Sequence, residues 1–442
     1  MRILISAGEA SGEMYGAQLI EALRRACDLG EAGVSPAPSN AGSEQSIAGE
    51  GPRATWQLEF FGVGGEKMRA AGCEIVVDSK DLAVVGITEI LGHLRKIWGL
   101  FHKLIAEADR RKPDLAIVID SPAFNWRVAR QMKKRGVPVV YYVCPQFWAW
   151  RQGRVRLLRK YVDKALVIFP FEEKFYRDRG VNAEFVGHPL AELARPSVSR
   201  EDYAEQHALN PAKEWITLMP GSRVKEVRMN LPGMIESARL LGSRYEFVLP
   251  VAPTLDAKFM ETLVGQASFG KNPAFSRADG RSKQTDGTTR SRALPGRNQG
   301  EDINIHLVPE ALPALAHSRV GIIASGTATV EAALMNLPFV MVYRVTPLTY
   351  LLGRSTVKVP HFAMVNLIAG KQVIPELVQQ DFTPEKVTAE IEKIIPESEA
   401  RKKMLAELKE VRDGLRGGEK ASLAPAERAA NTIFELLRAS HA

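Results

Sequence analysis

The sequence predicts an α/β protein with two Rossmann-like parallel-sheet domains followed by C-terminal helices. Short apolar runs alternate with helical patterns along most of the chain, and several runs are continuously apolar, as strands inside a parallel sheet are. The alternation occurs in two series that meet near residues 188–195. The length of 442 residues also indicates two or three domains, because one hydrophobic core rarely grows beyond about 250–300 residues.

The first series begins with a strand over Met1–Ser6, a glycine-rich turn and a helix over Tyr15–Arg25. Further apolar runs predict strands at 58–63, 115–119, 137–143 and 164–169. In the second series the predicted strands are 215–219, 245–251, 303–308, 320–324 and 339–343, with helices at 229–241, 312–317 and 328–335. Charged helical patterns at 384–395 and 401–438 complete the chain.

These patterns predict an N-terminal domain at residues 1–190, a C-terminal domain at 191–400 and helices at 401–442 that pack back towards the N-terminal domain. Residues 30–54 and 268–302 are rich in polar residues, Gly, Ser and Pro, which predicts two flexible insertions. Ligands of open α/β sheets bind at the carboxyl ends of the strands, so we expect the binding site in a cleft between the two domains.

The composition predicts a soluble cytosolic protein. Hydrophobic residues make up 45% and charged residues 25% of the chain, the usual balance of a globular protein. The longest stretch without charged residues, 136–150, is shorter than the ~20 residues of a membrane-spanning helix, and no signal peptide is visible. Residues 271–300 hold seven Lys and Arg against two Asp, so this stretch supplies five of the eight net positive charges. The rest of the chain is only mildly basic, which gives nucleic-acid binding little support.

A glycine-rich turn follows the first strand and opens a helix. Gly8 and Gly12 allow a tight turn and a close approach of the backbone to a ligand. The spacing differs from the GxGxxG of dinucleotide-binding enzymes, and the carboxylates of Glu9 and Glu13 disfavour an anion. The turn therefore indicates a hydroxylated ligand, with a purely structural turn as the alternative.

Asp120 ends the apolar strand at 115–119. A carboxylate at the carboxyl end of a parallel strand faces the ligand-binding edge of the sheet rather than the core. This position fits a general base that takes a proton from an attacking hydroxyl. The alternative is a carboxylate that caps the segment that follows.

The loop after the strand at 215–219 indicates a phosphate site. Gly221 and Ser222 leave the backbone accessible, and Arg223 offers a forked cation that suits phosphate oxygens. The loop alone is a weak signal. A second loop of the same domain strengthens it.

This second loop follows the strand at 320–324 and opens a helix. Ser325, Gly326 and Thr327 are small enough to let a diphosphate reach the helix N–H groups and the positive end of the helix dipole. Glu331 follows in the helix and either accepts hydrogen bonds from ribose hydroxyls or only complements the dipole. Together the two loops predict a nucleotide-diphosphate site.

Residues 87–112 form a strongly amphipathic helical pattern. One interpretation is a helix that faces the core. The other is an interfacial segment that touches lipid through Trp98, Leu100 and Phe101, with basic neighbours on the head groups. The aromatic run at 144–151 likewise fits either core or the flank of an acyl chain or sugar ring.

Taken together, these motifs resemble those of the lipid-A-disaccharide synthases, a family of inverting glycosyltransferases of GT-B architecture. The resemblance covers nearly the whole chain, except residues 30–54, 268–302 and the C-terminal tail. It is carried, in order, by AGEASGE, FFGVGGEKMRAAGCE, LAVVGITEIL, IDSPAFN, CPQFWAWRQGRV, FPFEEKFY, VGHPL, LMPGSRVKEV, ASGTATVEAAL and VNLIAGKQVIPEL.

The resemblance implies transfer of 2,3-diacylglucosamine from its UDP derivative to 2,3-diacylglucosamine 1-phosphate, giving a β(1→6) disaccharide and UDP. Asp120 matches the family's catalytic base and Arg223 its diphosphate-binding arginine. The segment from Ser325 to Thr327, with Glu331, matches the nucleotide loop and its helix, and Asn366 is implied in donor binding. The first-domain loop that faces the acceptor is implied to include Glu9, Ser11 and Gly12.

The resemblance also implies that the reaction needs no metal ion and no cofactor, and no DxD-like ligand pair is visible. The three cysteines are widely spaced and form no CxxC pair, which argues against a structural zinc site. The family works at the cytoplasmic face of the inner membrane, which favours the lipid-touching interpretation of the Trp98 region and peripheral attachment. A homodimer remains open. Ala123 stands where the family often has an acidic residue, so an auxiliary carboxylate is absent at that position.

Two alternatives stay beside this interpretation. One is another UDP-sugar enzyme of the same architecture, such as a UDP-N-acetylglucosamine 2-epimerase or a peptidoglycan glycosyltransferase, although the hydrophobic segment at 87–101 argues against an epimerase. The other is an inactive nucleotide-sugar-binding relative, which the joint presence of Asp120, Arg223 and Glu331 disfavours.

Overall fold

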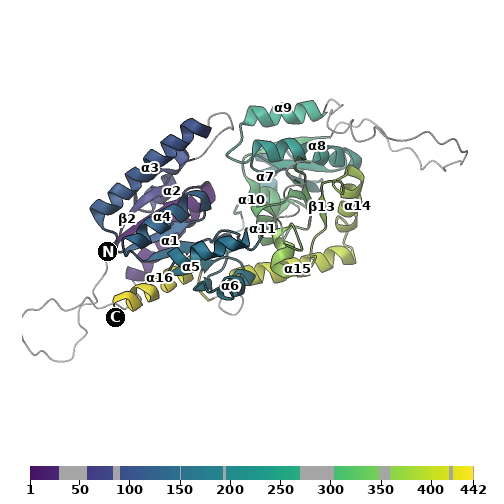
Figure 1. Cartoon of the computed structure of the whole chain (residues 1–442). Coiled ribbons are helices and arrows are strands. Elements are labelled where there is room, and N and C mark those ends of the chain that lie inside the picture. The colour runs from purple at the N-terminus through teal and green to yellow at the C-terminus, as the bar shows by residue number, and fades with distance from the viewer. Residues whose placement is uncertain are drawn as a thin grey trace, which may run out of the picture. The chain divides into compact units, whose positions relative to one another are not determined.

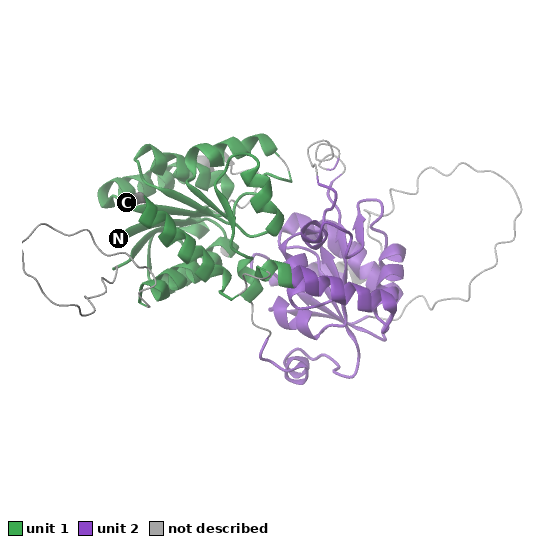
Figure 2. Cartoon of the chain, turned by 90° about the horizontal axis from the view of Figure 1, so that it is seen from below, with its two compact units in different colours: residues 1–192, 413–442 green, residues 193–412 purple. Residues whose placement is uncertain are grey.

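The computed structural model describes residues 1–28, 57–82, 90–149, 151–192, 196–268, 303–346, 350, 359–417 and 422–441. The chain divides into two compact units, which Figure 2 colours separately. Unit 1 consists of residues 1–192 and 413–442, and unit 2 of residues 193–412. Both chain ends therefore belong to unit 1. Of the two predicted insertions, residues 30–54 and 269–302 lie outside the described residues.

Unit 1 is built on a seven-stranded sheet in which every pair of neighbouring strands is parallel. Its strands are β1 (Arg2–Ala7), β2 (Glu59–Gly64), β3 (Cys73–Asp78), β4 (Leu115–Ile119), β5 (Val139–Tyr142), β6 (Lys164–Val167) and β7 (Ala183–Phe185). They are ordered β3-β2-β1-β4-β5-β6-β7. All five residues of β4 are buried, as its continuous apolar run predicts for a central strand.

Helices cover both faces of this sheet. The helices of unit 1 are α1 (Ala10–Asp28), α2 (Glu66–Ala70), α3 (Ile90–Arg111), α4 (Pro122–Lys134), α5 (Val155–Tyr161), α6 (Pro170–Arg177) and α16 (Pro425–His441), with short 3-10 turns η1 (Ser79–Leu82), η2 (Gln152–Arg154) and η3 (Pro189–Glu192). Because parallel crossovers are right-handed, α1 and α2 lie on one face and α3 to α6 on the other. Helix α16, yellow in Figure 1, packs against α1.

Unit 2 repeats the plan with a six-stranded parallel sheet, ordered β10-β9-β8-β11-β12-β13. Its strands are β8 (Trp215–Met219), β9 (Glu246–Pro250), β10 (Ile305–Val308), β11 (Val320–Ala324), β12 (Phe339–Tyr343) and β13 (Glu376–Val378). Its helices are α7 (Arg200–Gln206), α8 (Val224–Leu241), α9 (Ala257–Ser268), α10 (Ala311–His317), α11 (Thr327–Leu334), α13 (Met364–Ala369), α14 (Pro384–Ile394) and α15 (Glu399–Arg416), whose last turn belongs to unit 1.

In each sheet the chain order runs outward in both directions from one central pair of strands. The pair is β1 and β4 in unit 1, and β8 and β11 in unit 2. The loops at the carboxyl ends of such a pair diverge to opposite faces and leave room for a ligand, which makes this pair the switch point of the sheet. The predicted α/β class with two parallel sheets is confirmed.

The sequence analysis did not predict the edge strands β3, β7 and β13. β7 and β13 have three residues each, and acidic residues at positions 74 and 78 bound the apolar part of β3, so none of the three shows the apolar run by which the central strands were found. None of the helices within the described ranges is long and apolar enough to cross a membrane.

The buried face of α16 is expected to stabilise unit 1, and this can be tested by substitution. Phe434 is 3% exposed, whereas its neighbour Glu435 is exposed. Phe434→Ala removes a buried aromatic ring and leaves a cavity, so we expect it to lower the free energy of unfolding by about 3 kcal/mol in urea titrations. Glu435→Ala is the control and should change it by less than about 0.5 kcal/mol. Equal effects of the two variants would show that α16 contributes little to the core of unit 1.

Candidate active site

The switch point of unit 1 brings two predicted loops together. One follows β1 and holds Gly8 and Glu9, and the other follows β4 and holds Asp120 and Ser121. A Cβ atom added to Gly8 would lie only 2.6 Å from the Ser121 hydroxyl oxygen. The two loops are therefore in contact, and any side chain at position 8 would push them apart.

Asp120 and Ser121 both have a left-handed backbone, with φ of 48° and 46°. This conformation turns the chain sharply between β4 and α4, because Pro122 begins the helix directly afterwards. The N-cap position belongs to Ser121, and no side chain caps the helix there. Asp120 is therefore not the N-cap residue of α4, which removes the structural alternative considered for it.

The surroundings of Asp120 raise its pKa to about 6. The largest cause is burial, which disfavours the charged form, and the second is the nearby negative charge of Glu9. A hydrogen bond from the Ser121 N–H opposes both. Asp120 is thus ionised at neutral pH and is a stronger base than an ordinary aspartate, which suits proton abstraction from a hydroxyl.

The other acidic residues of the first loop have different surroundings. Glu9 is exposed on the loop, while Ser11 and Gly12 lie in the first turn of α1. Glu13 accepts a hydrogen bond of 2.7 Å from the Lys67 N–H at the start of α2. Glu13 is therefore structural, and Glu9 is the carboxylate of this loop that acts on Asp120.

In unit 2, the loop after β8 positions Arg223. The Arg223 guanidinium lies 2.9 Å from Glu226, whose other oxygen accepts a bond of 3.1 Å from the Ser222 N–H. Gly221 has a φ of 121°, and a Cβ there would lie 2.7 Å from Glu226. The Arg223 side chain is 74% exposed. Glu226 was missed by the sequence analysis, although its position three residues after Arg223 in a helix could have indicated the pair.

The loop after β11 lies across the same switch point. The Ser325 hydroxyl donates to the Phe362 carbonyl over 2.9 Å, and Gly326 and Thr327 are exposed where α11 begins. Burial raises the pKa of Glu331 in the same helix. No donor among the described residues forms a hydrogen bond with its carboxylate, which therefore keeps its capacity to accept bonds from a ligand.

Asn366 lies in a different environment from that of a ligand-contacting residue. It is fully buried, and its amide nitrogen donates to the Ile374 carbonyl and to Glu376 over 2.9 and 2.8 Å. Its oxygen accepts bonds from the Val373 and Ile374 N–H groups. Every polar atom of the side chain is thus hydrogen-bonded within the chain, so any part that Asn366 takes in donor binding is through these neighbours.

Helix α3 presents only part of its predicted lipid-facing set. Trp98 is 55% exposed, and Leu100 is half-buried. Phe101 is buried, with its ring 5.5 Å from that of Trp98 and 5.9 Å from that of Phe124. Phe101 therefore belongs to the core, contrary to the prediction, because the helix turns this side towards α4.

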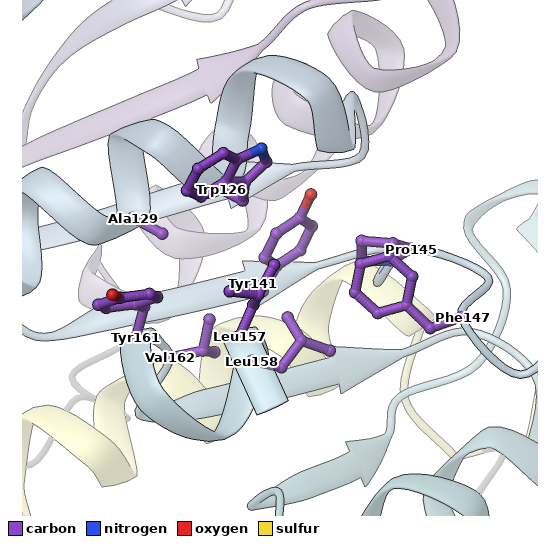
Figure 3. A pocket seen from close by; sticks show the side chains of 9 residues that line it. All are labelled: Trp126, Ala129, Tyr141, Pro145, Phe147, Leu157, Leu158, Tyr161 and Val162. Carbon is purple, nitrogen blue, oxygen red and sulfur yellow. The ribbon is translucent and has the colours of Figure 1, made fainter. Parts of the chain in front are cut away.

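The aromatic run before α5 also belongs mainly to the core. Phe147 and Trp148 are buried, and the Trp148 indole N–H donates to Glu172 over 2.8 Å. Trp150 lies outside the described residues. Figure 3 shows a small apolar pocket between α4, β5 and α5, in which Trp126, Tyr141 and Phe147 form part of the lining.

Across the part of the chain that the structure describes, no group of three His, Cys, Asp or Glu side chains is placed to hold a metal ion. The charged groups at the two switch points differ in sign. Unit 1 offers the carboxylates of Asp120 and Glu9, and unit 2 offers Arg223 beside small residues at a helix start. The first arrangement suits a hydroxyl that loses a proton, and the second suits an anion.

Solved structures with the same fold define the class of protein. The TM-score is 0.56 with a UDP-GlcNAc 2-epimerase from Neisseria meningitidis, at 11% identity over 99% of this chain and 100% of that one. It is 0.52 with the calicheamicin glycosyltransferase CalG4, at 13% identity over 100% and 99% of the two chains. At these identities the likeness concerns the fold alone, which is the GT-B type that glycosyltransferases and epimerases share.

The sequence then decides the family. A family model described as lipid-A-disaccharide synthetase matches residues 3–284 and 295–430. The lipid-A-disaccharide synthase of Koribacter versatilis (strain Ellin345) is 47% identical over 99% of this chain and 98% of its own length. That of Acidobacterium capsulatum is 43% identical over 98% and 96% of the two chains. The chain belongs to the lipid-A-disaccharide synthase family, as its motifs predict.

The effect of Glu9 on Asp120 can be tested directly. Glu9→Gln removes a negative charge, so the pKa of Asp120 should fall below about 6 but stay above its ordinary value, because burial persists. The pKa is measured from the carboxyl NMR shift of isotope-labelled aspartate. Glu21→Gln, an exposed change in α1, is the control and should leave this pKa unchanged. Identical titration curves for the two variants would mean that Glu9 does not act on Asp120.

Proposed function

We propose that this protein joins UDP-2,3-diacylglucosamine to 2,3-diacylglucosamine 1-phosphate, forming the β(1→6)-linked disaccharide 1-phosphate and releasing UDP. The observation that carries the proposal is the family match over residues 3–284 and 295–430, which includes the loops at both switch points. The reaction is a step of lipid A biosynthesis. The charges at those loops agree with its chemistry.

Asp120 is the general base of the proposed reaction. Its carboxylate takes the proton of the acceptor's 6-hydroxyl while that oxygen attacks the anomeric carbon of the donor. The new C–O bond forms as the bond from the anomeric carbon to the phosphate oxygen breaks, so the configuration inverts. A pKa of about 6 supports this role, because the carboxylate is ionised at neutral pH and yet more basic than usual.

Unit 2 binds the UDP part of the donor and stabilises it as the leaving group. Arg223 contacts the diphosphate, together with the N–H groups at Gly221 and Ser222 and at the start of α11. These groups supply positive charge as the phosphate oxygen gains an electron pair, so we expect no need for a metal ion or another cofactor. In Arg223 the guanidinium is already oriented by Glu226.

The remaining donor residues act in two ways. Glu331 accepts hydrogen bonds from ribose hydroxyls, with Ser325, Gly326 and Thr327 around the phosphates. Asn366 acts indirectly, because it bonds to Glu376, which accepts from the Phe362 and Ala363 N–H groups. The Phe362 carbonyl in turn accepts from Ser325, so Asn366 supports the nucleotide loop. Ser11, Gly12 and Glu9 line the acceptor side.

We also propose peripheral contact with the cytoplasmic face of the inner membrane. Trp98 offers an exposed aromatic ring on α3. On the same sheet face, α4, η2 and α5 carry exposed cations that form no ion pair with a carboxylate of the described residues: Arg127, Arg130, Lys134, Arg154, Arg156, Arg159 and Lys160. The only acidic residue between 121 and 164 is Asp163, which binds Lys133. Such a face is attracted to anionic lipid head groups.

Two outcomes separate this proposal from its alternatives. An epimerase would not need the acylated acceptor, and an inactive relative would bind UDP without turnover. We therefore expect the purified protein in detergent micelles to release UDP only when both acylated substrates are present. Conversion of unacylated UDP-N-acetylglucosamine into its C2 epimer, with no acceptor present, would support the epimerase instead.

The role of Asp120 is tested in the same assay. Asp120→Asn cannot accept the proton, so turnover should fall at least about 100-fold while UDP binding is retained. Asp178→Asn, an exposed change directly after the end of α6, serves as the control and should keep full turnover. Turnover of Asp120→Asn at the control's level would exclude Asp120 as the base.

The membrane contact predicts salt-sensitive binding to anionic vesicles. Each cation near an anionic surface contributes about 1 kcal/mol, so the double change Arg156→Gln/Arg159→Gln should weaken binding to phosphatidylglycerol vesicles about 30-fold at low salt. The matched control is Lys402→Gln/Lys403→Gln, two exposed cations of α15. Binding is measured by cosedimentation. If both double variants bind equally well, the α4–α5 face is not the contact.

A further inference from the structure

The backbone at Asp120 and Ser121 is held in a conformation that it would rarely adopt alone. Both residues have a positive φ although neither is glycine. A left-handed conformation costs an ordinary residue of the order of 1–2 kcal/mol, and two occur in succession here. Neighbouring groups must therefore hold this turn in place.

Asn125 is one of these groups. It is fully buried in α4, and its amide nitrogen lies 2.8 Å from the Ile119 carbonyl oxygen and 2.9 Å from that of Asp120. The same nitrogen lies 3.1 Å from the Ser6 carbonyl oxygen, and the Ser6 hydroxyl donates to the Asn125 oxygen over 2.7 Å. One side chain thus ties the Asp120 turn to both central strands, β1 and β4.

Tyr141 is the second group. Its hydroxyl, on the neighbouring strand β5, donates to the Asp120 carbonyl over 2.8 Å. Its ring forms part of the wall of the apolar pocket in Figure 3, so packing fixes the direction of the hydroxyl. The Asp120 carbonyl therefore has two side-chain donors from two different elements.

We propose that Asn125 and Tyr141 are positioning residues for Asp120, which hold its backbone in the left-handed turn that aims the carboxylate at the acceptor hydroxyl. This inference rests on the proposed role of Asp120 as the base. Neither residue touches the reacting atoms. They act on the direction and the burial of the carboxylate, and a misplacement of about 1 Å at a reacting group can lower the rate by about 100-fold.

A matched pair of neighbouring tyrosines separates this role from simple packing. Tyr141 and Tyr142 are both fully buried on β5, but the Tyr142 hydroxyl has no hydrogen-bond partner among the described residues. Tyr141→Phe should lower kcat about fivefold, the effect of one lost hydrogen bond, with KM unchanged. Tyr142→Phe removes the same atom and should leave kcat unchanged.

A second pair of variants, Asn125→Ala and Asn230→Ala, tests the positioning role of Asn125. Asn230 of α8 is equally buried and donates to the Pro220 carbonyl over 3.1 Å, in the loop that precedes Arg223. Asn125→Ala should lower kcat about 100-fold. It should also move the acid limb of the pH–rate profile, expected near pH 6, to lower pH, because a released carboxylate is better hydrated and its pKa falls. Asn230→Ala should leave this limb in place and raise KM for the donor.

Thermal unfolding shows whether each variant is folded, and if Asn125→Ala is not, the tyrosine pair decides. Asp120→Asn is assayed in parallel. Turnover retained in Asp120→Asn would contradict the proposed base itself. If Asp120→Asn is inactive but Tyr141→Phe and folded Asn125→Ala keep the kcat and pH profile of the unchanged protein, the positioning role is wrong. It is also wrong if Tyr142→Phe loses as much kcat as Tyr141→Phe.

Discussion

Buried backbone groups must keep hydrogen-bond partners where strands end, and this requirement shapes both switch points. Beyond the end of a strand, a carbonyl can no longer bond to the neighbouring strand, yet here it remains away from water. Three asparagines are fully buried in the described part of the chain: Asn125, Asn230 and Asn366. Asn125 and Asn230 bond through their side-chain amides to the carbonyls of Asp120 and Pro220, which directly follow β4 and β8. Asn366 bonds to the Ile374 carbonyl, just before β13. The loops can therefore bend sharply without leaving a buried carbonyl unpaired.

The shared topology explains how one plan serves two chemical tasks. In both sheets the chain order reverses at the central pair of strands, so two loops from distant parts of the sequence meet at one edge. What differs is the side chains on those loops. In unit 1 burial raises the pKa of Asp120 and Glu9 raises it further, whereas Glu226 orients the cation of Arg223 in unit 2. A neighbouring carboxylate thus adds to the basicity of a buried aspartate in one unit and orders an anion site in the other.

The sequence allowed prediction of the loops at the switch points but not of the buried side chains that hydrogen-bond to them. Continuous apolar runs mark the central strands, and the residue after such a run must lie at the carboxyl edge, which is how Asp120 was found. A single buried Asn leaves no periodic signal, so Asn125 and Asn230 were missed. Motif resemblance names a residue without the direction of its side chain, so Asn366 was assigned to donor binding with no sign that its amide is hydrogen-bonded within the chain. Phe101 was misplaced because a helical pattern does not tell which side faces a neighbouring helix.

The buried carboxylate and the strained backbone at Asp120 both lower the free energy of unfolding of unit 1. The turn that holds Asp120 must therefore be stabilised by other groups. The folded protein raises the pKa of Asp120 from 3.8 to about 6, so it binds this proton more tightly than the unfolded chain does. The free energy of unfolding therefore falls as pH rises from about 4 to 6, by up to about 3 kcal/mol for a shift of this size. Two left-handed residues add backbone strain at the same place. The carboxylate does not stabilise its own position at neutral pH, so the buried amide and hydroxyl donors around its backbone must do so.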